Sequence, residues 1–314
     1  MLARALSVLL LLSATAAAQS GVAPVQMVRG RENHLLVPVN VNGQSAHLLL
    51  DTGSDVTFIE ESRAKALGVR IGGAEIVSGG RGFPRGTVDN LRVGNLSLGQ
   101  TQVALYDPAQ FRGPVPGKGG KPADGILGLD LLRRYKAVIN CRTQQLFLQS
   151  GPAPRLNLTD TTRALGFTRI PIHDSARGFI SVPCEIAGKA GAVIIDTGAF
   201  VTVFNEDDLR AFQLEETPTK LTARTPFGRV RAVQLARIND LRIGGVAIEP
   251  QRFAVMNLFP AKKPLRTYTG INRIEYYDAR AFRSRLDLWG LLGAELLYQH
   301  SAIVDLDSMA LFLK

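Results

Sequence analysis

The sequence predicts a mainly β protein built from two similar lobes that a pseudo-twofold axis relates, with short helices. The first observation is that Asp-Thr-Gly occurs twice, at Asp51-Thr52-Gly53 and at Asp196-Thr197-Gly198. The second is that each copy follows an apolar run, Leu48-Leu49-Leu50 or Val193-Ile194-Ile195. The third is that short apolar runs alternate with glycine-rich turns in both halves, which favours strands over long helices.

Matched motifs recur in the same order in both halves, which indicates an internal repeat. An offset of 145 relates Asp51 to Asp196, and the offset grows to 165 by the end of the chain. The second half therefore contains 20 additional residues, the difference between 165 and 145. The matched pairs are Val37-Pro38 with Val182-Pro183, Gly43 with Gly188, Val56-Thr57 with Val201-Thr202, 91–94 with 241–244, 126–128 with 291–293, and Phe147 with Phe312.

Turn and helix signals place the elements of each half. Asn42-Gly43 is a signal for a two-residue hairpin turn, and Gly188 occupies the matching place in the second half. Gly68 stands where a helix would end. The expected elements are hairpins over 35–51, 137–148, 180–196 and 302–313, and helices over 60–67, 129–135 and 294–300.

These motifs resemble the aspartic proteases of the pepsin and retropepsin type. In that family each lobe supplies an apolar run before Asp-Thr-Gly and, later, a hydrophobic-hydrophobic-Gly block. The segments that follow, 128–132 and 293–297, are similar to the helix start of retropepsins. In outline the chain is most similar to a secreted or periplasmic bacterial group with two retropepsin-like lobes in one chain. The resemblance implies the bilobal acid-protease fold.

The resemblance also implies that Asp51 and Asp196 are catalytic. Two carboxyl groups a few ångströms apart share one proton, because both cannot be ionised cheaply. The ionised one can take a proton from water as the water attacks a peptide carbonyl, and the protonated one can serve as the acid. The expected function is therefore that of an aspartic endopeptidase acting on extended polypeptide segments.

Six neighbouring residues are expected to support this pair. Gly53 and Gly198 allow a tight turn, and the hydroxyls of Thr52 and Thr197 would bond to the opposite lobe, as in the family. Ser54 would donate a hydrogen bond to Asp51. Its counterpart Ala199 has no hydroxyl, so the shared proton would reside more on Asp196.

A glycine-rich hairpin is expected to close over the substrate as a flap. In lobe 1 its tip would be Gly79 and Gly80, followed by Phe83; in lobe 2 it would contain Phe227. Asp55 follows the first Asp-Thr-Gly as in retroviral enzymes and is a further candidate for substrate contact. No tyrosine stands where the pepsin flap carries one, and both segments could also be ordinary surface hairpins.

The N-terminus has the layout of a signal peptide, with Arg4, an apolar stretch and Ala16-Ala17-Ala18. Residues 1–18 are therefore expected to direct export to the periplasm or the exterior. Lobe 1 is expected at 25–150, a linker at 151–163 and lobe 2 at 164–314. Because no other long apolar run is present, no stable membrane insertion is expected.

Composition restricts the remaining possibilities. The net charge of +10 is spread along the chain without a nucleic-acid motif, so no nucleic-acid partner is expected. The four histidines show no ligand spacing, and neither a metal nor a cofactor is expected. Cys141 and Cys184 could form a disulfide in an exported chain, although their repeat counterparts, Leu306 and Val39, are equally consistent with buried thiols.

The sequence leaves rival functions open. Both acids come from one chain, so a monomer acting on a protein or peptide substrate is expected. A non-catalytic peptide-binding module on the same fold is the alternative, although such a module need not keep both acids. A maturation protease with a single target is a third reading.

Overall fold

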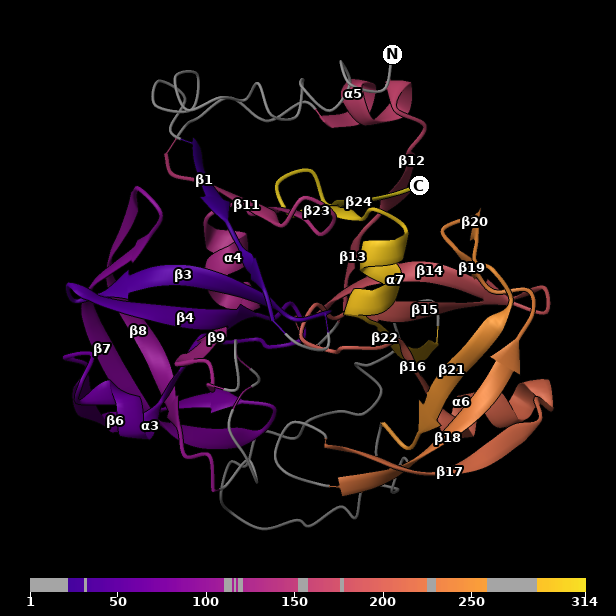
Figure 1. Ribbon diagram of the computed structural model, residues 1–314, viewed down its shortest axis with the longest axis horizontal. Coiled ribbons are helices and arrows are strands. Elements are labelled where there is room, and N and C mark those ends of the chain that lie inside the picture. Colours follow the sequence, from indigo (N-terminus) through magenta and orange to yellow (C-terminus); the bar gives the residue numbers. More distant parts are fainter. Residues whose placement is uncertain are drawn as a thin grey trace, which may run out of the picture.

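The computed structural model describes residues 22–30, 33–109, 115, 117, 121–151, 158–175, 178–224, 230–258 and 287–314. Three β-sheets make up two lobes and a layer that joins them (Figure 1). Lobe 1, in indigo to magenta, lies on the left of the view and lobe 2, mostly orange, on the right. The joining sheet lies above both.

Lobe 1 is an eight-stranded sheet with two short helices. Its elements are β2 (Val28–Arg29), β3 (Leu35–Val41), β4 (Gln44–Leu50), β5 (Phe58–Glu60), α3 (Glu61–Ala64), β6 (Arg70–Ser78), β7 (Arg81–Val93), β8 (Leu96–Tyr106), β9 (Gly125–Leu127) and α4 (Leu129–Arg134). The strand order is β2-β3-β4-β9-β5-β8-β7-β6, so the β6–β7 hairpin forms one edge.

Lobe 2 is a ten-stranded sheet of the same plan. Its elements are β13 (His173–Asp174), β14 (Ile180–Ile186), β15 (Lys189–Ile195), β16 (Val203–Asn205), α6 (Glu206–Leu209), a 3₁₀ turn (Arg210–Phe212), β17 (Glu216–Arg224), β18 (Val230–Ile238), β19 (Arg242–Ile243), β20 (Val246–Ala247), β21 (Gln251–Met256), β22 (Leu288–Leu292) and α7 (Ala294–Gln299). The order is β17-β18-β21-β16-β22-β15-β14-β19-β20, and β13 pairs with β14.

The joining sheet takes strands from both halves of the chain. It contains β1 (Val22–Gln26), β10 (Val138–Asn140), β11 (Gln145–Gln149), β12 (Thr168–Pro171), β23 (Ile303–Asp305) and β24 (Ala310–Leu313), in the order β1-β11-β10-β23-β24-β12. At its centre β10 pairs antiparallel with β23, and Ile139 lies opposite Val304. Equivalent strands of the two repeats therefore meet at the middle of this sheet.

The structure confirms the predicted repeat. The bounds of β3 and β14 differ by 145, as do those of β4 and β15 and of β5 and β16. By α4 and α7 the difference is 165. The fold is therefore mainly β, with two lobes related by a pseudo-twofold axis and short helices.

Left-handed backbone at matched turns explains the two central hairpins. Asn42 and Gly43 have φ of 51° and 90°, and Ala187 and Gly188 have φ of 50° and 71°. Two successive residues with positive φ make the turn that suits the twist of a hairpin, which favours Asn-Gly and glycine. These turns direct β4 and β15 back toward the Asp-Thr-Gly loops.

Buried aliphatic side chains from both lobes form one large cluster that continues into the joining sheet. Cys141 and Cys184 lie within it as free, buried thiols, so the disulfide considered from the sequence is absent. Burial raises the pKa of each thiol to about 12. The alternative of buried structural thiols is the one the structure supports.

The predicted domain boundaries can be compared where the chain is described. Among the described residues the first strand begins at Val22, and helix α5 (Leu158–Ala164) occupies the second part of the expected linker. The expected signal peptide, Phe227 and residues 259–286 of lobe 2 lie outside the described residues. Among the residues that the structure covers, no helix is long and apolar enough to cross a membrane.

Candidate active site

Each Asp-Thr-Gly loop is held between two strands and a helix start. Strand β4 pairs in parallel with β9, and β15 pairs in parallel with β22. The Asp51 amide donates to Leu127 O at 3.1 Å, and the Asp196 amide to Leu292 O at 3.0 Å. In each lobe a carbonyl oxygen of the loop also accepts a hydrogen bond, at 2.8 Å, from the first backbone amide of the following helix; in lobe 1 this is the amide of Leu129. The matched contacts place the two loops at the same point of each lobe.

The two aspartates face each other across the pseudo-twofold axis. A Cβ atom placed on Gly53 would lie 2.5 Å from Cγ of Asp196, and one on Gly198 would lie 2.4 Å from Cγ of Asp51. Real Cβ atoms do not approach other atoms so closely. Each carboxyl group thus packs against the glycine of the opposite loop, which explains why glycine is needed at both positions.

The threonines lock the loops together as expected. Thr52 Oγ1 donates to Ile195 O at 2.7 Å and accepts the Thr197 amide at 3.1 Å. Thr197 Oγ1 donates to Leu50 O at 2.9 Å and accepts the Thr52 amide at 3.0 Å. Both side chains are at most 2% exposed. Four buried inter-lobe hydrogen bonds therefore fix the distance between the two carboxyl groups.

The expected hydrogen bond from Ser54 to Asp51 is not formed. Ser54 Oγ donates instead to Val56 O at 2.8 Å. In lobe 2, where Ala199 has no hydroxyl, backbone amides donate to the aspartate instead. The amides of Gly198 and Ala199 both donate to Asp196 Oδ1, at 3.0 and 2.9 Å. Asp51 Oδ1 accepts the Gly53 amide at 2.7 Å. The Ser54 hydroxyl thus bonds to a carbonyl oxygen of its own loop. The identity of a side chain alone does not show which of several local acceptors it will bind.

The surroundings of the two carboxyl groups differ. Burial raises the pKa of Asp51 well above its usual range, and repulsion from Asp196 raises it further. Burial also raises the pKa of Asp196, but the Ala199 amide, a hydrogen bond with Asp51 and the Gly198 amide oppose the rise. Two loop amides bond to Asp196 Oδ1 and one to Asp51 Oδ1, which favours Asp196 as the ionised member and Asp51 as the protonated one, the reverse of the distribution expected from Ser54 and Ala199.

A second pair of acids, both partly buried, bonds to the segments that follow the loops. Thr57 Oγ1 donates to Asp130 Oδ1 at 2.7 Å, and in lobe 2 the Thr202 amide donates to Glu295 Oε1 at 2.5 Å. Burial raises the pKa of both acids. Their matched places in the Gly128-Leu129-Asp130 and Gly293-Ala294-Glu295 motifs could have indicated this role from the sequence.

The lobe 1 flap candidate is the β6–β7 hairpin. Gly79 and Gly80 form its turn, with φ of 54° and 77°. Ser78 Oγ donates to Asp55 Oδ1, which ties the hairpin to the first Asp-Thr-Gly loop. Phe83 is 2% exposed and its ring lies edge-on to Phe58, 5.1 Å between centroids, so this side chain packs inside the lobe rather than facing a substrate.

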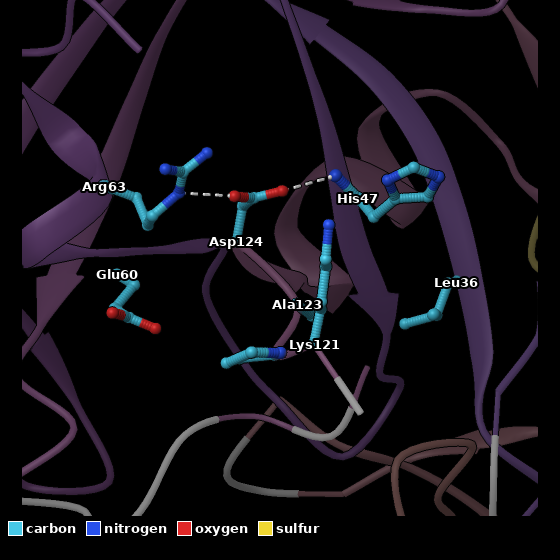
Figure 2. A pocket seen from close by; sticks show the side chains of 8 residues that line it. Leu36, His47, Glu60, Arg63, Lys121, Ala123 and Asp124 are labelled. Atoms are coloured by element: carbon cyan, nitrogen blue, oxygen red, sulfur yellow. Dashed lines mark hydrogen bonds and ion pairs between the residues drawn. The ribbon is translucent and has the colours of Figure 1, made fainter. Parts of the chain in front are cut away.

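Lobe 1 also contains a pocket of about 540 Å³ with charged side chains in its lining (Figure 2). Arg63 Nε donates to one oxygen of Asp124 at 2.7 Å, and the His47 amide donates to the other at 2.9 Å. Glu60 accepts the Ser62 hydroxyl at 2.5 Å. Both acids of the pocket thus have partners. Its lining residues, which do not include the Asp51–Asp196 pair, are Leu36, His47, Glu60, Arg63, Lys121, Pro122, Ala123 and Asp124.

Comparisons with known proteins indicate the family of the chain. A family model described as aspartyl protease matches the chain twice, at residues 37–131 and 182–294, once in each lobe. DNA damage-inducible protein 1 of Chaetomium globosum is 28% identical over 134 residues, which are 42% of this chain and 29% of that protein. The same-named protein of Neurospora crassa is 29% identical over 143 residues, 44% of this chain and 30% of that protein. The matched part therefore spans less than a third of those relatives.

Among solved structures, an aspartic proteinase from Irpex lacteus is similar, with a TM-score of 0.49 at 14% identity, covering 93% of this chain and 96% of that one. The two segments that fit the family model cover about two thirds of the 314 residues and include both Asp-Thr-Gly loops. On that match, and with both loops facing each other as described, the chain belongs to the aspartyl protease family.

Proposed function

We propose that this protein is an aspartic endopeptidase whose catalytic groups are Asp51 and Asp196. The observation that carries the proposal is the packing of each carboxyl group against the glycine of the opposite loop, at 2.4–2.5 Å from a Cβ placed there. This arrangement brings two partly buried acids together with unequal hydrogen bonding. Two such groups can hold one proton between them and divide the roles of acid and base.

The unequal surroundings suggest the division of roles. Asp196 accepts two loop amides and would be the ionised member that takes a proton from the attacking water. Asp51 would carry the shared proton, donate a hydrogen bond with it to the substrate carbonyl oxygen as charge develops there, and then transfer it to the leaving nitrogen; the proton that Asp196 took from the water then remains on the pair as the shared proton. The pair would titrate as one unit, so pH–rate profiles would report on both groups together.

Exposed apolar side chains near the loops suggest a preference for apolar substrate residues. Phe200 is 44% exposed and directly follows Ala199. Val77 is 59% exposed and precedes Ser78, whose hydroxyl binds Asp55. An extended peptide could pair its backbone with the edge of the β6–β7 hairpin while its side chains contact such residues. The preference can be read from a peptide library.

We also propose that the enzyme is exported and acts as a monomer. The apolar stretch and Ala16-Ala17-Ala18 near the N-terminus support export through a signal peptide. One chain supplies both acids, which supports activity without a second copy. Edman sequencing of protein recovered from the periplasm or medium, together with light scattering, would examine both statements.

The test of the function compares Asp51→Asn and Asp196→Asn with the wild type on a peptide library. Each variant should lose at least about 1,000-fold in kcat/KM, because one carboxyl group cannot serve as both acid and base. Asp160→Asn is the matched control, since this acid lies on helix α5 with a side chain 74% exposed. Full cleavage by either folded active-site variant would exclude the shared pair, and a wild type that binds but never cleaves peptides would favour the binding module.

A further inference from the structure

His34 is a buried histidine that lobe 1 directs at the catalytic loop of lobe 2. It immediately precedes β3 and is 4% exposed. Its Nε2 lies 3.0 Å from the carbonyl oxygen of Gly198, which is 164 residues away in the sequence. The repeat counterpart at an offset of 145 is Phe179, which has no ring nitrogen. The contact therefore has no equivalent donor in the other half of the repeat.

The partners fix the direction of this hydrogen bond. A carbonyl oxygen can only accept, so Nε2 must carry the proton and donate it. Nδ1 is buried and has no hydrogen-bond partner among the described residues. A neutral ring with its proton on Nε2 satisfies this environment, because a proton on Nδ1 would be a buried donor without an acceptor.

The peptide unit that accepts this bond also contacts the catalytic acid. The carbonyl of Gly198 and the amide of Ala199 belong to one planar peptide group. That amide donates to Asp196 Oδ1 at 2.9 Å. A donor at the carbonyl end polarises the peptide group and strengthens the hydrogen bond at its amide end. His34, the peptide and Asp196 thus form a chain of two hydrogen bonds.

We propose that His34 is a positioning residue that, from lobe 1, fixes the Gly198–Ala199 peptide and so stabilises the ionised form of Asp196. This inference rests on the proposed function, because it assigns the base of that reaction. His34 acts through the peptide and does not contact the reacting atoms. Its presence in one repeat and absence from the other is what makes the two aspartates unequal.

Other charged groups lie near this chain of hydrogen bonds. Asp51 faces Asp196 from the opposite loop, and Glu295 and Asp130 lie behind the loops. Arg29 of β2 bonds to Asn33 at 3.1 Å and stacks on the Tyr298 ring at 3.8 Å. A substitution at His34 leaves all of them in place, so their titration is common to the variants compared below.

The experiment compares two side chains of nearly equal shape, His34→Gln and His34→Met. Glutamine keeps a donor at the end of the side chain, and methionine does not. In the methionine variant the acid limb of kcat/KM should move up by about 0.5 to 1 pH unit, and kcat should fall roughly tenfold with KM within about twofold. The glutamine variant should stay within about threefold of the wild type at every pH. His173→Gln, at an exposed histidine of β13, should change nothing.

A second measurement does not depend on peptide cleavage. Urea unfolding at pH 7 of His34→Met, Asp196→Asn and the double variant forms a mutant cycle. His34→Met should destabilise the protein and so raise the equilibrium constant for unfolding. This increase should be about fivefold smaller when residue 196 is asparagine, because the carboxylate charge that His34 is proposed to stabilise is then absent. His34→Phe, which copies the lobe 2 residue, replaces the methionine variant if that one does not fold.

The outcomes separate the two proposals. A wild type without peptidase activity would refute the proposed function, while the unfolding cycle would still decide the role of His34. Equal pH profiles for the glutamine and methionine variants would show that a donor is not needed and would overturn the inference. Additive unfolding energies in the cycle would overturn it as well.

Discussion

Replacing Thr52 by valine should weaken the contact between the lobes far more than its size suggests. Valine has nearly the shape of threonine but cannot donate to Ile195 O, now at 2.7 Å, or accept from the Thr197 amide, now at 3.1 Å. Thr52 is 0% exposed, so water cannot replace the hydroxyl. Each of these two buried groups left unpaired costs about 1–3 kcal/mol, which gives a loss of about 2–6 kcal/mol.

Serine at the same position separates the hydroxyl from the methyl group. Thr52→Ser keeps both hydrogen bonds and removes one buried methyl group, at a cost of about 1 kcal/mol. Urea denaturation at pH 7 measures both free energies of unfolding, and kcat/KM reports whether the two aspartates keep their separation. A valine variant within about 0.5 kcal/mol of the serine variant would contradict the role assigned to these inter-lobe hydrogen bonds.

Three further predictions follow from the active-site geometry. Burial raises the pKa of Asp51 and Asp196 in the fold, so the native state loses stability as pH rises from the unfolded-state value, about 3.9, through the raised values. Asp51→Asn and Asp196→Asn should therefore be more resistant to urea than the wild type at pH 7 and lose this advantage near pH 3. If variant and wild type differed in urea resistance by the same amount at both pH values, burial of the ionised carboxyl groups would not be the cause. Ser54→Ala should leave the acid limb of kcat/KM in place and cost about 1 kcal/mol or less, because its hydroxyl binds Val56 O rather than the acid; an upward shift of the limb would restore the expectation from sequence. Gly198→Ala should lower kcat/KM at least about 100-fold, since the new Cβ would lie 2.4 Å from Asp51 Cγ, whereas Gly73→Ala, in open space, should keep full activity.

The sequence predicted those parts of the fold that local patterns and the repeat determine. Strand and helix bounds recur at offsets of 145 and 165, as read from the motifs, because equivalent residues have equivalent packing in the two lobes. The Asp-Thr-Gly copies indicated the site for the same reason. A repeated motif identifies the residues on a shared axis, even though nothing in the sequence states the distance between them.

Features that depend on competition between partners were not predictable. The Ser54 hydroxyl was expected to bond to its own aspartate, but it bonds to Val56 O in the turn instead. His34 contacts Gly198 across 164 residues, and a single histidine carries no pattern. Cys141 lies in the turn that follows β10 of the joining sheet and Cys184 in β14 of lobe 2, a placement that their sequence separation could not show. In each case the outcome depends on tertiary packing rather than on local propensity.

A duplicated site within one chain can be symmetric in its frame and unequal in its chemistry. The frame is nearly identical on the two sides, with the loop amides bonded at 3.1 and 3.0 Å and the helix amides at 2.8 Å. Two identical acids in such a frame would hold the shared proton equally, and the roles of acid and base would be exchangeable. Because the repeats are covalently joined, one side can change alone. The Ala199 amide bonds to Asp196 at 2.9 Å, and behind it lies His34, where the other repeat has phenylalanine. The inequality between the two aspartates thus arises from neighbours of the motif and not from the motif itself. Substitutions at these neighbours should therefore move the pH profile without removing either acid.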